Sequence, residues 1–220
     1  MQSIPIYNDG IGKVDLVESM GSDLKVVNAA RVSYGKHKTE LDEGDIKLIR
    51  YLLKNKHTSP FEHNLMTFRF KVPLFVRSQH HRHRVWKFNE ISRRYSGENL
   101  EFYFPNEWRK QSKDNKQCSG EWFNSPAISA YVEKHAKDSV ALYEKMIDEG
   151  VARELARIVL PQNLYTEYYG TIDLHNALHF LKLRLHSHAQ WEIQVVAEAM
   201  RDIMNDLYPY CMKAYNDVCN

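Results

Sequence analysis

Apolar residues in the first third of the chain follow two different spacings. From Asp45 to Asn55 they recur every three or four positions, which predicts an amphipathic helix. From Met66 to Val72 every second residue is apolar, as in a strand with one buried face. This part of the chain therefore contains a helix followed by a strand.

A basic stretch, Gln79–Arg84, breaks this regular pattern. It follows a short apolar segment, Leu74–Val76, that Pro73 opens, and it precedes a second short strand predicted at Glu101–Phe104. We therefore expect the basic stretch to lie between regular elements. The residues Pro105–Pro126, rich in Lys, Gln, Ser and Asn, predict an exposed loop.

Helical spacing dominates the second half of the chain. A long amphipathic helix is predicted at Ala127–Glu149, with Gly150 as its stop, and a shorter one at Val151–Val159 ends before Pro161. These helices follow one another directly.

One strand and two more helices are predicted beyond Pro161. The segment Leu164–Tyr169 is aromatic and strand-like, Asp173 can cap a helix that carries leucines up to Leu185, and Ile193–Leu207 predicts another helix. Strands and helices alternate without regular βαβ units, which favours an α+β fold with a mixed sheet and packed helices. The 220 residues, 43% of them hydrophobic, suffice for a single domain over 1–220.

Composition narrows the possible functions. A formal net charge of +2 disfavours a protein that coats nucleic acid by bulk phosphate neutralisation. Cys118, Cys211 and Cys219 are odd in number and lack Cys-x-x-Cys spacing, so a disulfide scaffold or cysteine zinc site is not expected. With no leader and no long apolar stretch, we expect an unprocessed, soluble cytoplasmic protein with neither membrane nor nucleic-acid partners.

Arginines are the candidates for nucleotide binding, because the chain lacks the G-x-G-x-x-G and G-x-x-x-x-G-K-[ST] loops that commonly hold phosphates. The densest run is RHRVWKFNEISRRYS at residues 82–96. Guanidinium groups offer planar forks of donors that match phosphate oxygens, so this run could bind phosphorylated ligands. A solvated basic loop is the alternative.

The spacing within this run is similar to that of a known enzyme family. Arg82-His83-Arg84, seven residues and then Ser92 reproduces the R-H-R-x7-S motif of flavin-dependent thymidylate synthases. The surrounding Asn89-Glu90-x-Ser92-x-Arg94-Tyr95-Ser96 resembles the same family. The resemblance continues in AARVS at 29–33, HTSPFEH at 57–63, ARIVLP at 156–161, LR at 183–184 and SHAQWE at 187–192. It covers nearly the whole chain and fades in the polar loop and the C-terminal tail.

The resemblance implies an activity and an assembly. The implied reaction is reductive methylation of dUMP to dTMP, with 5,10-methylenetetrahydrofolate as carbon donor and release of tetrahydrofolate. The implied hydride source is FAD reduced by NADPH, which fits the fact that no side chain can donate a hydride. The implied assembly is a homotetramer whose active sites are built from several subunits, with FAD at their junction.

The resemblance also implies roles for individual residues. Those implied to contact FAD are Ser59, Arg82, His83, Arg84, Glu90, Asp173, Leu174, His175 and His179. Those implied to surround dUMP are Gln79, Arg82, Glu90, Ile91, Ser92, Arg93, Arg94, Arg157 and Arg184. Arg94 and Arg157 are the natural phosphate partners, because their charge matches a dianion. Arg184 is the implied catalytic residue, since a cation at the uracil N3 and O4 edge makes C5 a better nucleophile.

Several of these assignments keep an alternative. Asp173 and His179 stand where family members often carry asparagines, and Asp173 can be only a helix cap. Arg93 stands where a small residue is often found. Binding of dUMP through the backbone would tolerate an arginine there, whereas a tightly packed turn would not. Arg184 can be an ordinary cation at a helix C-terminus. His57 is either close to the folate or a hydrogen-bonded histidine between a helix and a strand.

No cysteine nucleophile is evident in the sequence, in contrast to classical thymidylate synthase. Cys118 falls in the polar loop, and Cys211 and Cys219 fall in the tail. Ser92 lies outside a G-x-S-x-G elbow and has no dedicated base, so we assign it to substrate binding.

Two other functional classes can be weighed against this one. The pairs His81-x-His83 and His186-x-His188 could serve a metal-dependent hydrolase, but no H-E-x-x-H or carboxylate pattern accompanies them, so we predict no metal site. An RNA- or single-strand-binding module could use the arginines of residues 82–94 together with Trp86, Phe88 and Tyr95 as stacking platforms. Stoichiometric metal without flavin would favour the first class, and steeply salt-dependent oligonucleotide binding the second.

Overall fold

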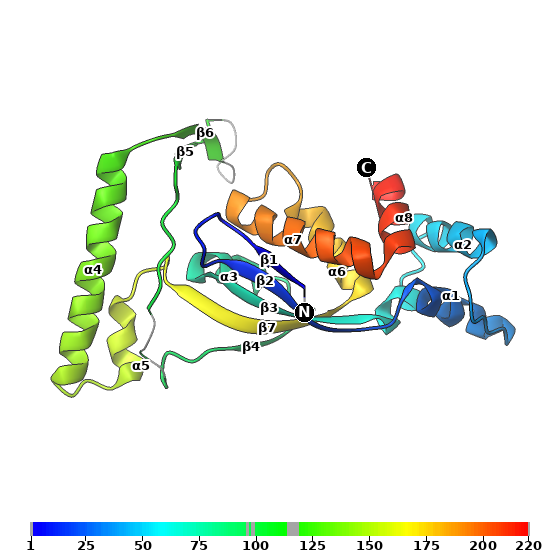
Figure 1. Cartoon of the computed structure of the whole chain (residues 1–220), viewed down its shortest axis with the longest axis horizontal. Coiled ribbons are helices and arrows are strands. Elements are labelled where there is room, and N and C mark those ends of the chain that lie inside the picture. The colour runs from blue at the N-terminus through cyan, green and yellow to red at the C-terminus, as the bar shows by residue number, and fades with distance from the viewer. Residues whose placement is uncertain (1, 96, 98–99, 114–118, 220) are drawn as a thin grey trace.

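A five-stranded sheet forms the centre of the computed structural model, which describes residues 2–95, 97, 100–113 and 119–219 (Figure 1). Its spatial order is β1-β2-β3-β7-β4, and each neighbouring pair is antiparallel. The strands are Ser3–Pro5 (β1), Lys13–Met20 (β2), Leu65–Pro73 (β3), Lys87–Glu90 (β4) and Tyr165–Asp173 (β7). The α+β class is confirmed, and the sheet is antiparallel rather than mixed.

Side-chain alternation gives the sheet one buried face. In β3 the residues Met66, Phe68, Phe70 and Val72 are all fully buried, whereas the residues between them are partly exposed. On the other face Arg69 Nε donates to Glu167 Oε1 of β7 at 2.7 Å. The alternation predicted from the sequence is therefore confirmed, since period-two patterning reflects a half-buried sheet.

Gly170 of β7 allows the aromatic core to close. A Cβ at this position would lie 2.9 Å from Trp86 Cε3 and 3.0 Å from Phe70 Cε2, closer than real Cβ contacts. Trp86 in turn packs edge-on against Phe70, with ring centroids 5.7 Å apart. The turn before β4 is anchored to the sheet through this contact.

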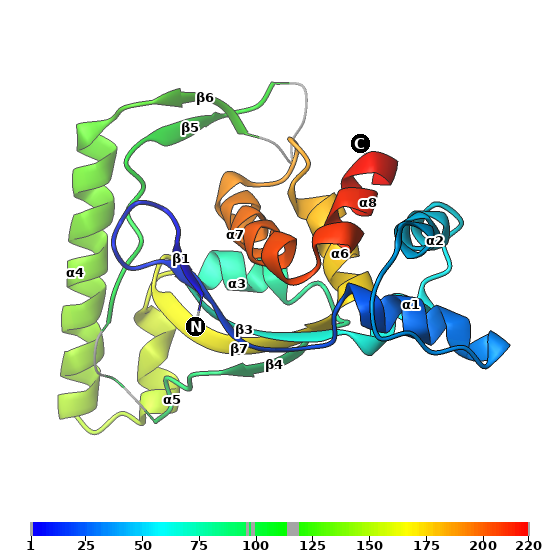
Figure 2. The ribbon, with the colours of Figure 1, turned by 45° about the vertical axis from the view of Figure 1, so that its right-hand side comes forward.

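Helices cover the buried face of the sheet (Figures 1 and 2). They are Leu74–His80 (α3), Leu174–Arg184 (α6) and Trp191–Leu207 (α7), and Pro209–Cys219 (α8) packs against α7. In α7 the inward positions Ile193, Val196, Met200 and Ile203 are fully buried, which confirms the predicted helix. Asp173 caps α6 by accepting a hydrogen bond from the Asn176 N–H at 2.9 Å, as predicted.

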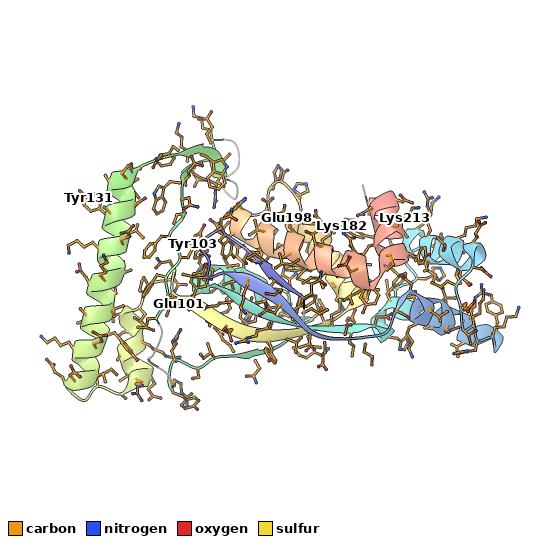
Figure 3. The ribbon with its side chains drawn as sticks, in the orientation of Figure 1. Glu101, Tyr103, Tyr131, Lys182, Glu198 and Lys213 are labelled. Carbon is orange, nitrogen blue, oxygen red and sulfur yellow. The ribbon has the colours of Figure 1, made fainter. Side chains whose placement is uncertain are left out.

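The two ends of the sheet carry further elements. At one end lie Asp23–Arg31 (α1), Val32–Tyr34 (η1), Glu43–Lys54 (α2) and Ser59–His63 (η2). At the other lie Pro126–Asp148 (α4), Arg153–Ala156 (α5), Arg157–Val159 (η3) and a hairpin of Trp108–Gln111 (β5) with Ser119–Phe123 (β6). Tyr131 points outward from α4 and is 74% exposed (Figure 3).

Several sequence predictions were wrong. Leu74–Val76 and the first two residues of the basic stretch form α3, so that stretch does not lie wholly between regular elements. The predicted strand at Glu101–Phe104 has only the isolated bridge between Phe102 and Leu164 among described residues. The predicted loop contains the β5–β6 hairpin, whereas Cys118 lies outside the described residues, as does Ser96.

Among the helices that the structure describes, none combines the length and the apolar composition needed to span a membrane.

Candidate active site

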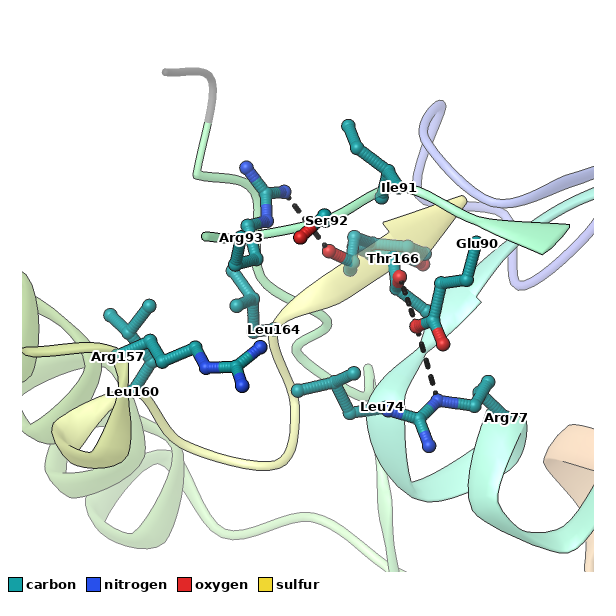
Figure 4. Close-up of a pocket in the computed structure, with 11 residues that line it drawn as sticks. Leu74, Arg77, Glu90, Ile91, Ser92, Arg93, Arg157, Leu160, Leu164 and Thr166 are labelled. Atoms are coloured by element: carbon teal, nitrogen blue, oxygen red, sulfur yellow. Dashed lines mark hydrogen bonds and ion pairs between the residues drawn. The ribbon is translucent and has the colours of Figure 1, made fainter. Parts of the chain in front are cut away.

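A cavity of about 300 Å³ beside β4, here called the β4 pocket, brings together five residues implied to surround the nucleotide. These are Glu90, Ile91, Ser92, Arg93 and Arg157. Arg77 and Thr166 line it as well, together with Tyr165 and the apolar residues Leu74, Leu160 and Leu164 (Figure 4). A concave site with a few convergent polar groups is the usual form of a small-molecule site.

Strand register places Glu90 in this pocket. Glu90 is the last residue of β4 and pairs with Tyr168, while Phe88 pairs with Gly170. Alternate residues of a strand share a face, so Glu90 projects to the same side as Thr166 and Tyr168. There its Oε1 accepts hydrogen bonds from Thr166 Oγ1 at 2.6 Å and from Arg77 Nε at 3.1 Å.

The turn after β4 presents the following polar residues. The Ile91 N–H donates to the Glu167 carbonyl at 2.9 Å, which extends the strand pairing by one residue. Ser92 Oγ accepts from the Arg94 N–H at 3.2 Å, and Arg93 Nη2 donates to the Tyr165 carbonyl at 3.3 Å. These bonds fix the backbone of the turn at the mouth of the β4 pocket.

Arg157 reaches the same pocket from η3. Its Nε donates to the Glu154 carbonyl at 3.2 Å, and no ion pair is recorded for it within the described part of the chain. The same holds for Arg94, whose Nη2 donates to Tyr95 OH at 3.3 Å and which is exposed outside the pocket lining. Both guanidinium groups therefore retain donors for an anion.

Arg184 and His83 form a second site, here called the Arg184 cluster. Arg184 Nε donates to His83 Nε2 at 2.9 Å, and the His83 ring lies edge-on to Phe180 at 4.9 Å. Burial, the charge of Arg184 and His179 lower the pKa of His83 to about 4. Because a guanidinium can only donate, His83 must be neutral with Nε2 unprotonated, which agrees with this pKa.

Gln79 of α3 belongs to a chain of hydrogen bonds that reaches α7. Its Nε2 donates to Gln190 Oε1, and Gln190 Nε2 donates to Glu192 Oε2 at 2.9 Å. The buried Glu192 also accepts from Arg109 Nη2 at 2.7 Å and from Tyr103 OH at 3.2 Å. The chain connects α3 through the start of α7 to the β5–β6 hairpin.

A cavity of about 530 Å³ between α2, η2 and α6, here called the α6 pocket, holds two residues implied to contact FAD. His175 and His179 line it with His57, Lys54, Lys56, Thr58 and Lys182, and the remaining lining is Leu52, Leu53, Phe61, Leu178, Tyr215 and Val218. No carboxylate is among these lining residues. Cationic donors beside apolar walls suit a ligand that carries both a diphosphate and aromatic rings.

The other residues implied for FAD have different surroundings. Both carboxylate oxygens of Asp173 accept hydrogen bonds from Asn176, so the cap uses this side chain. Leu174 is buried, and its N–H donates to the Asn64 carbonyl at 2.9 Å. Ser59 begins η2, next to the α6 pocket lining. Cofactor contact stays a prediction for all three.

Not all residues implied for the nucleotide line the β4 pocket. One group lines the β4 pocket, whereas Gln79, Arg82 and Arg184 are absent from its lining. Arg82 and Arg84 are exposed in the turn between α3 and β4. A complete site would need these groups to be brought together.

Sequence reasoning missed Arg77 and Thr166 in the β4 pocket and Lys182 in the α6 pocket. Predicting a helix for the residues after Pro73 would have been needed to place Arg77 against the sheet. Thr166 would have required the register between β4 and β7, which links residues far apart in the sequence.

Two of the aromatics proposed for base stacking are built into the core. Trp86 is 6% exposed and stacks on Phe88 at 5.7 Å, while Tyr95 is 76% exposed. His81 stacks on Phe88 at 4.0 Å, and no group of three or more His, Cys, Asp or Glu side chains suited to a metal ion occurs in the described ranges. Packing against neighbouring rings therefore occupies Trp86 and Phe88, whereas Tyr95 remains exposed.

Comparisons with known proteins agree with the sequence resemblance. The family model for "Thymidylate synthase complementing protein" matches residues 15–210. A flavin-dependent thymidylate synthase from Thermus thermophilus is 46% identical over 216 residues, covering 98% of this chain and 78% of the relative. One from Wolbachia pipientis wMel is also 46% identical, over 213 residues, covering 94% of this chain and 75% of the relative.

Solved structures with the same fold include the UMP/dUMP methylase PolB from Streptomyces cacaoi. Bound with 5-Br dUMP, it matches with a TM-score of 0.83 and 37% identity, covering 93% of this chain and 94% of PolB. Bound with 5-Br UMP, it matches with a TM-score of 0.80 and 36% identity, covering 93% of each chain.

Proposed function

The chain belongs to the family of flavin-dependent thymidylate synthases, and from this premise we propose that it converts dUMP to dTMP by reductive methylation. In this reaction 5,10-methylenetetrahydrofolate donates the carbon and leaves as tetrahydrofolate, and bound FAD, reduced by NADPH, supplies the hydride. The observation that carries the proposal is the β4 pocket, where Glu90, Ile91, Ser92, Arg93 and Arg157 converge.

Arg157 and the turn after β4 are assigned to the phosphate end of dUMP. Arg157 lines the pocket and has no recorded ion pair with any described residue, and the Ser92 hydroxyl lies on the same lining. Arg94 follows in the same turn and has no ion-pair partner among the residues described. Cationic donors with this disposition bind a dianion by charge-assisted hydrogen bonds.

Arg184 is assigned to the reacting end of dUMP. The neutral His83 accepts from its Nε and so constrains the guanidinium, and no partner for the other N–H groups is recorded within the described part of the chain. A fixed cation beside N3 and O4 of uracil stabilises negative charge on the ring and strengthens C5 as a nucleophile.

The α6 pocket and the exposed Arg82 and Arg84 are assigned to FAD. His175, His179 and Lys182 offer donors for the diphosphate, and Leu52, Phe61 and Leu178 offer apolar contact for a ring system. His57 lines the same pocket and stays a candidate for the folate side.

The surroundings of Cys211 agree with a mechanism that uses no cysteine nucleophile. Cys211 is fully buried, and burial, together with Asp23, raises the pKa of its thiol, so it remains protonated and inaccessible. This cysteine usage also supports a cytoplasmic location, which is part of the proposal.

Shared active sites in a homotetramer are a further part of the proposal. They are supported by the absence of Gln79, Arg82 and Arg184 from the lining of the β4 pocket. In this arrangement the β4 pocket of one subunit would be completed by Gln79, Arg82 and Arg184 of another copy in the symmetric oligomer.

The direct test measures dTMP formation from dUMP by purified protein with FAD, NADPH and methylenetetrahydrofolate, omitting each component in turn. Wild-type protein should need all of them. Arg184→Ala should lose about two orders of magnitude in kcat/KM, as expected for one transition-state donor. Arg201→Ala is a matched control, because Arg201 is a partly exposed arginine on α7 that pairs with Asp202. Turnover without flavin, or an unaffected Arg184→Ala variant, would contradict the proposal.

Mixed oligomers test the shared site separately. Arg157→Ala and Arg184→Ala should each be nearly inactive alone, whereas their coexpressed mixture should regain up to about a quarter of wild-type activity if each site draws these residues from two chains. No recovery in a confirmed mixed oligomer would mean that both residues act within one chain.

A further inference from the structure

Arg77 and Thr166 lie on the β4 pocket although the sequence resemblance gives neither a role. Arg77 comes from α3, Thr166 from β7, and both meet Glu90 of β4 (Figure 4). Thr166 is 4% exposed, whereas the side chain of Arg77 is 31% exposed. Three elements therefore converge on one carboxylate.

Both donors bind the same carboxylate oxygen. Thr166 Oγ1 donates to Glu90 Oε1 at 2.6 Å, and Arg77 Nε donates to that oxygen at 3.1 Å. For Oε2, no hydrogen bond or ion pair is recorded with any residue that the structure describes, and the Glu90 side chain remains 24% exposed on the pocket. The carboxylate is thus held by one oxygen and presents the other.

The chemistry of a carboxylate limits what Oε2 can bind. An ionised carboxylate only accepts hydrogen bonds, so it repels a phosphate and finds no donor in the uracil carbonyls. In dUMP the remaining donors are N3–H and the 3′-hydroxyl of the sugar. Arg157 and Ser92 line the same 300 Å³ cavity and are assigned to the phosphate, so the attached sugar is the group within reach of Glu90.

Arg77 also resolves an electrostatic conflict. A carboxylate in a pocket that receives a phosphate dianion would weaken binding by like-charge repulsion. The Arg77 guanidinium at 3.1 Å compensates the charge of Glu90 while leaving Oε2 available. The pocket can therefore hold both an anion and an acceptor for a hydroxyl.

We propose that Arg77 and Thr166 are positioning residues that hold Glu90 so that its Oε2 accepts a hydrogen bond from the sugar hydroxyl of the nucleotide. The inference rests on the proposed function, because it takes dUMP as the ligand of the β4 pocket. It makes sugar recognition a property of three residues from three elements of this chain.

Thr166→Val removes the hydroxyl at nearly constant volume, and Thr166→Ser restores it. We expect Thr166→Val to raise the KM for dUMP about fivefold to tenfold with little change in kcat, since a hydrogen bond of this kind contributes about 1 kcal/mol. Thr166→Ser should lie near wild type. Thr171→Val is the matched control, because its hydroxyl pairs with Thr67 at 3.0 Å on the opposite face of β7.

The second readout compares dUMP with 2′,3′-dideoxyuridine 5′-monophosphate, which lacks the sugar hydroxyl. Wild type and Thr171→Val should bind dUMP more tightly than the analogue, whereas Thr166→Val should bind the two nearly alike. Arg77→Met serves as a second variant if Thr166→Val does not fold, and should show the same loss of discrimination.

Three outcomes separate the inference from the proposed function. If wild type turns over dUMP and Thr166→Val keeps full discrimination against the dideoxy analogue, the inference is wrong and the function stands. If Thr166→Val weakens both nucleotides equally, its role is structural and the inference is again wrong. If wild type neither binds nor converts dUMP, the proposed function and the inference fail together.

Discussion

Removing the hydrogen-bond acceptor of Arg184 is a sharp test of the Arg184 cluster. In the structure, His83 Nε2 accepts a hydrogen bond from Arg184 Nε at 2.9 Å. Arg184 is partly buried, and this burial lowers its pKa. A hydrogen bond to a charged group contributes about 1.5–3 kcal/mol. If the contact holds Arg184 for catalysis, His83→Leu should lower kcat/KM about tenfold to a hundredfold.

His83→Gln is the matched variant, because the glutamine side-chain oxygen can occupy the place of Nε2 and accept from Arg184. It should retain most of the activity that His83→Leu loses. The assay is dTMP formation at saturating FAD, with FAD affinity measured separately for each variant by flavin absorbance, since His83 is also assigned to the cofactor. Equal activity of the leucine and glutamine variants, at equal flavin occupancy, would refute the positioning role of His83.

Three further predictions concern stability. Arg109→Met leaves the buried Glu192 without its charge partner, so the free energy of unfolding, measured by thermal unfolding, should fall by about 3 kcal/mol. An unchanged melting temperature would contradict a stabilising ion pair between the β5–β6 hairpin and α7. Gly170→Ala forces a Cβ against Trp86 and should lower the free energy of unfolding by about 1–3 kcal/mol in denaturant unfolding. An unchanged free energy of unfolding would contradict the close contact between Gly170 and Trp86. Because the pKa of His83 falls from 6.5 to about 4 on folding, the unfolded chain binds the extra proton between these pH values. Stability should therefore drop as pH falls through that window, by about 1 kcal/mol after allowance for partial exposure, and His83→Gln should remove this component.

The sequence predicts the elements whose periodicity reflects burial. The alternation from Met66 to Val72 arises because one face of β3 lies entirely in the core, and the helix after Asp173 begins where its cap predicts. In contrast, α3 has only seven residues and joins an apolar start to a basic end, so it contains too few turns for its period to be recognised.

The candidate site likewise contains residues that the sequence identifies and residues that only the fold brings in. Residues 90–93 are contiguous, and Arg157 lies in a matched motif, so a motif can identify them without any fold. Arg77 and Thr166 acquire their place from the packing of α3 over the edge strand β4 and from the register of β4 with β7. Such contacts join residues that no local pattern relates.

The most direct test of the proposed function is a single turnover of the reduced flavoprotein without oxygen. The enzyme is loaded with FAD, reduced with NADPH, separated from excess reductant and mixed with dUMP, methylenetetrahydrofolate or both, while the flavin spectrum is followed. We predict return of the oxidised spectrum only when both are present, with dTMP and tetrahydrofolate formed in equal amounts to the flavin oxidised. Formation of dTMP with the flavin still reduced, or with dihydrofolate as the folate product, would contradict a flavin-dependent reductive methylation.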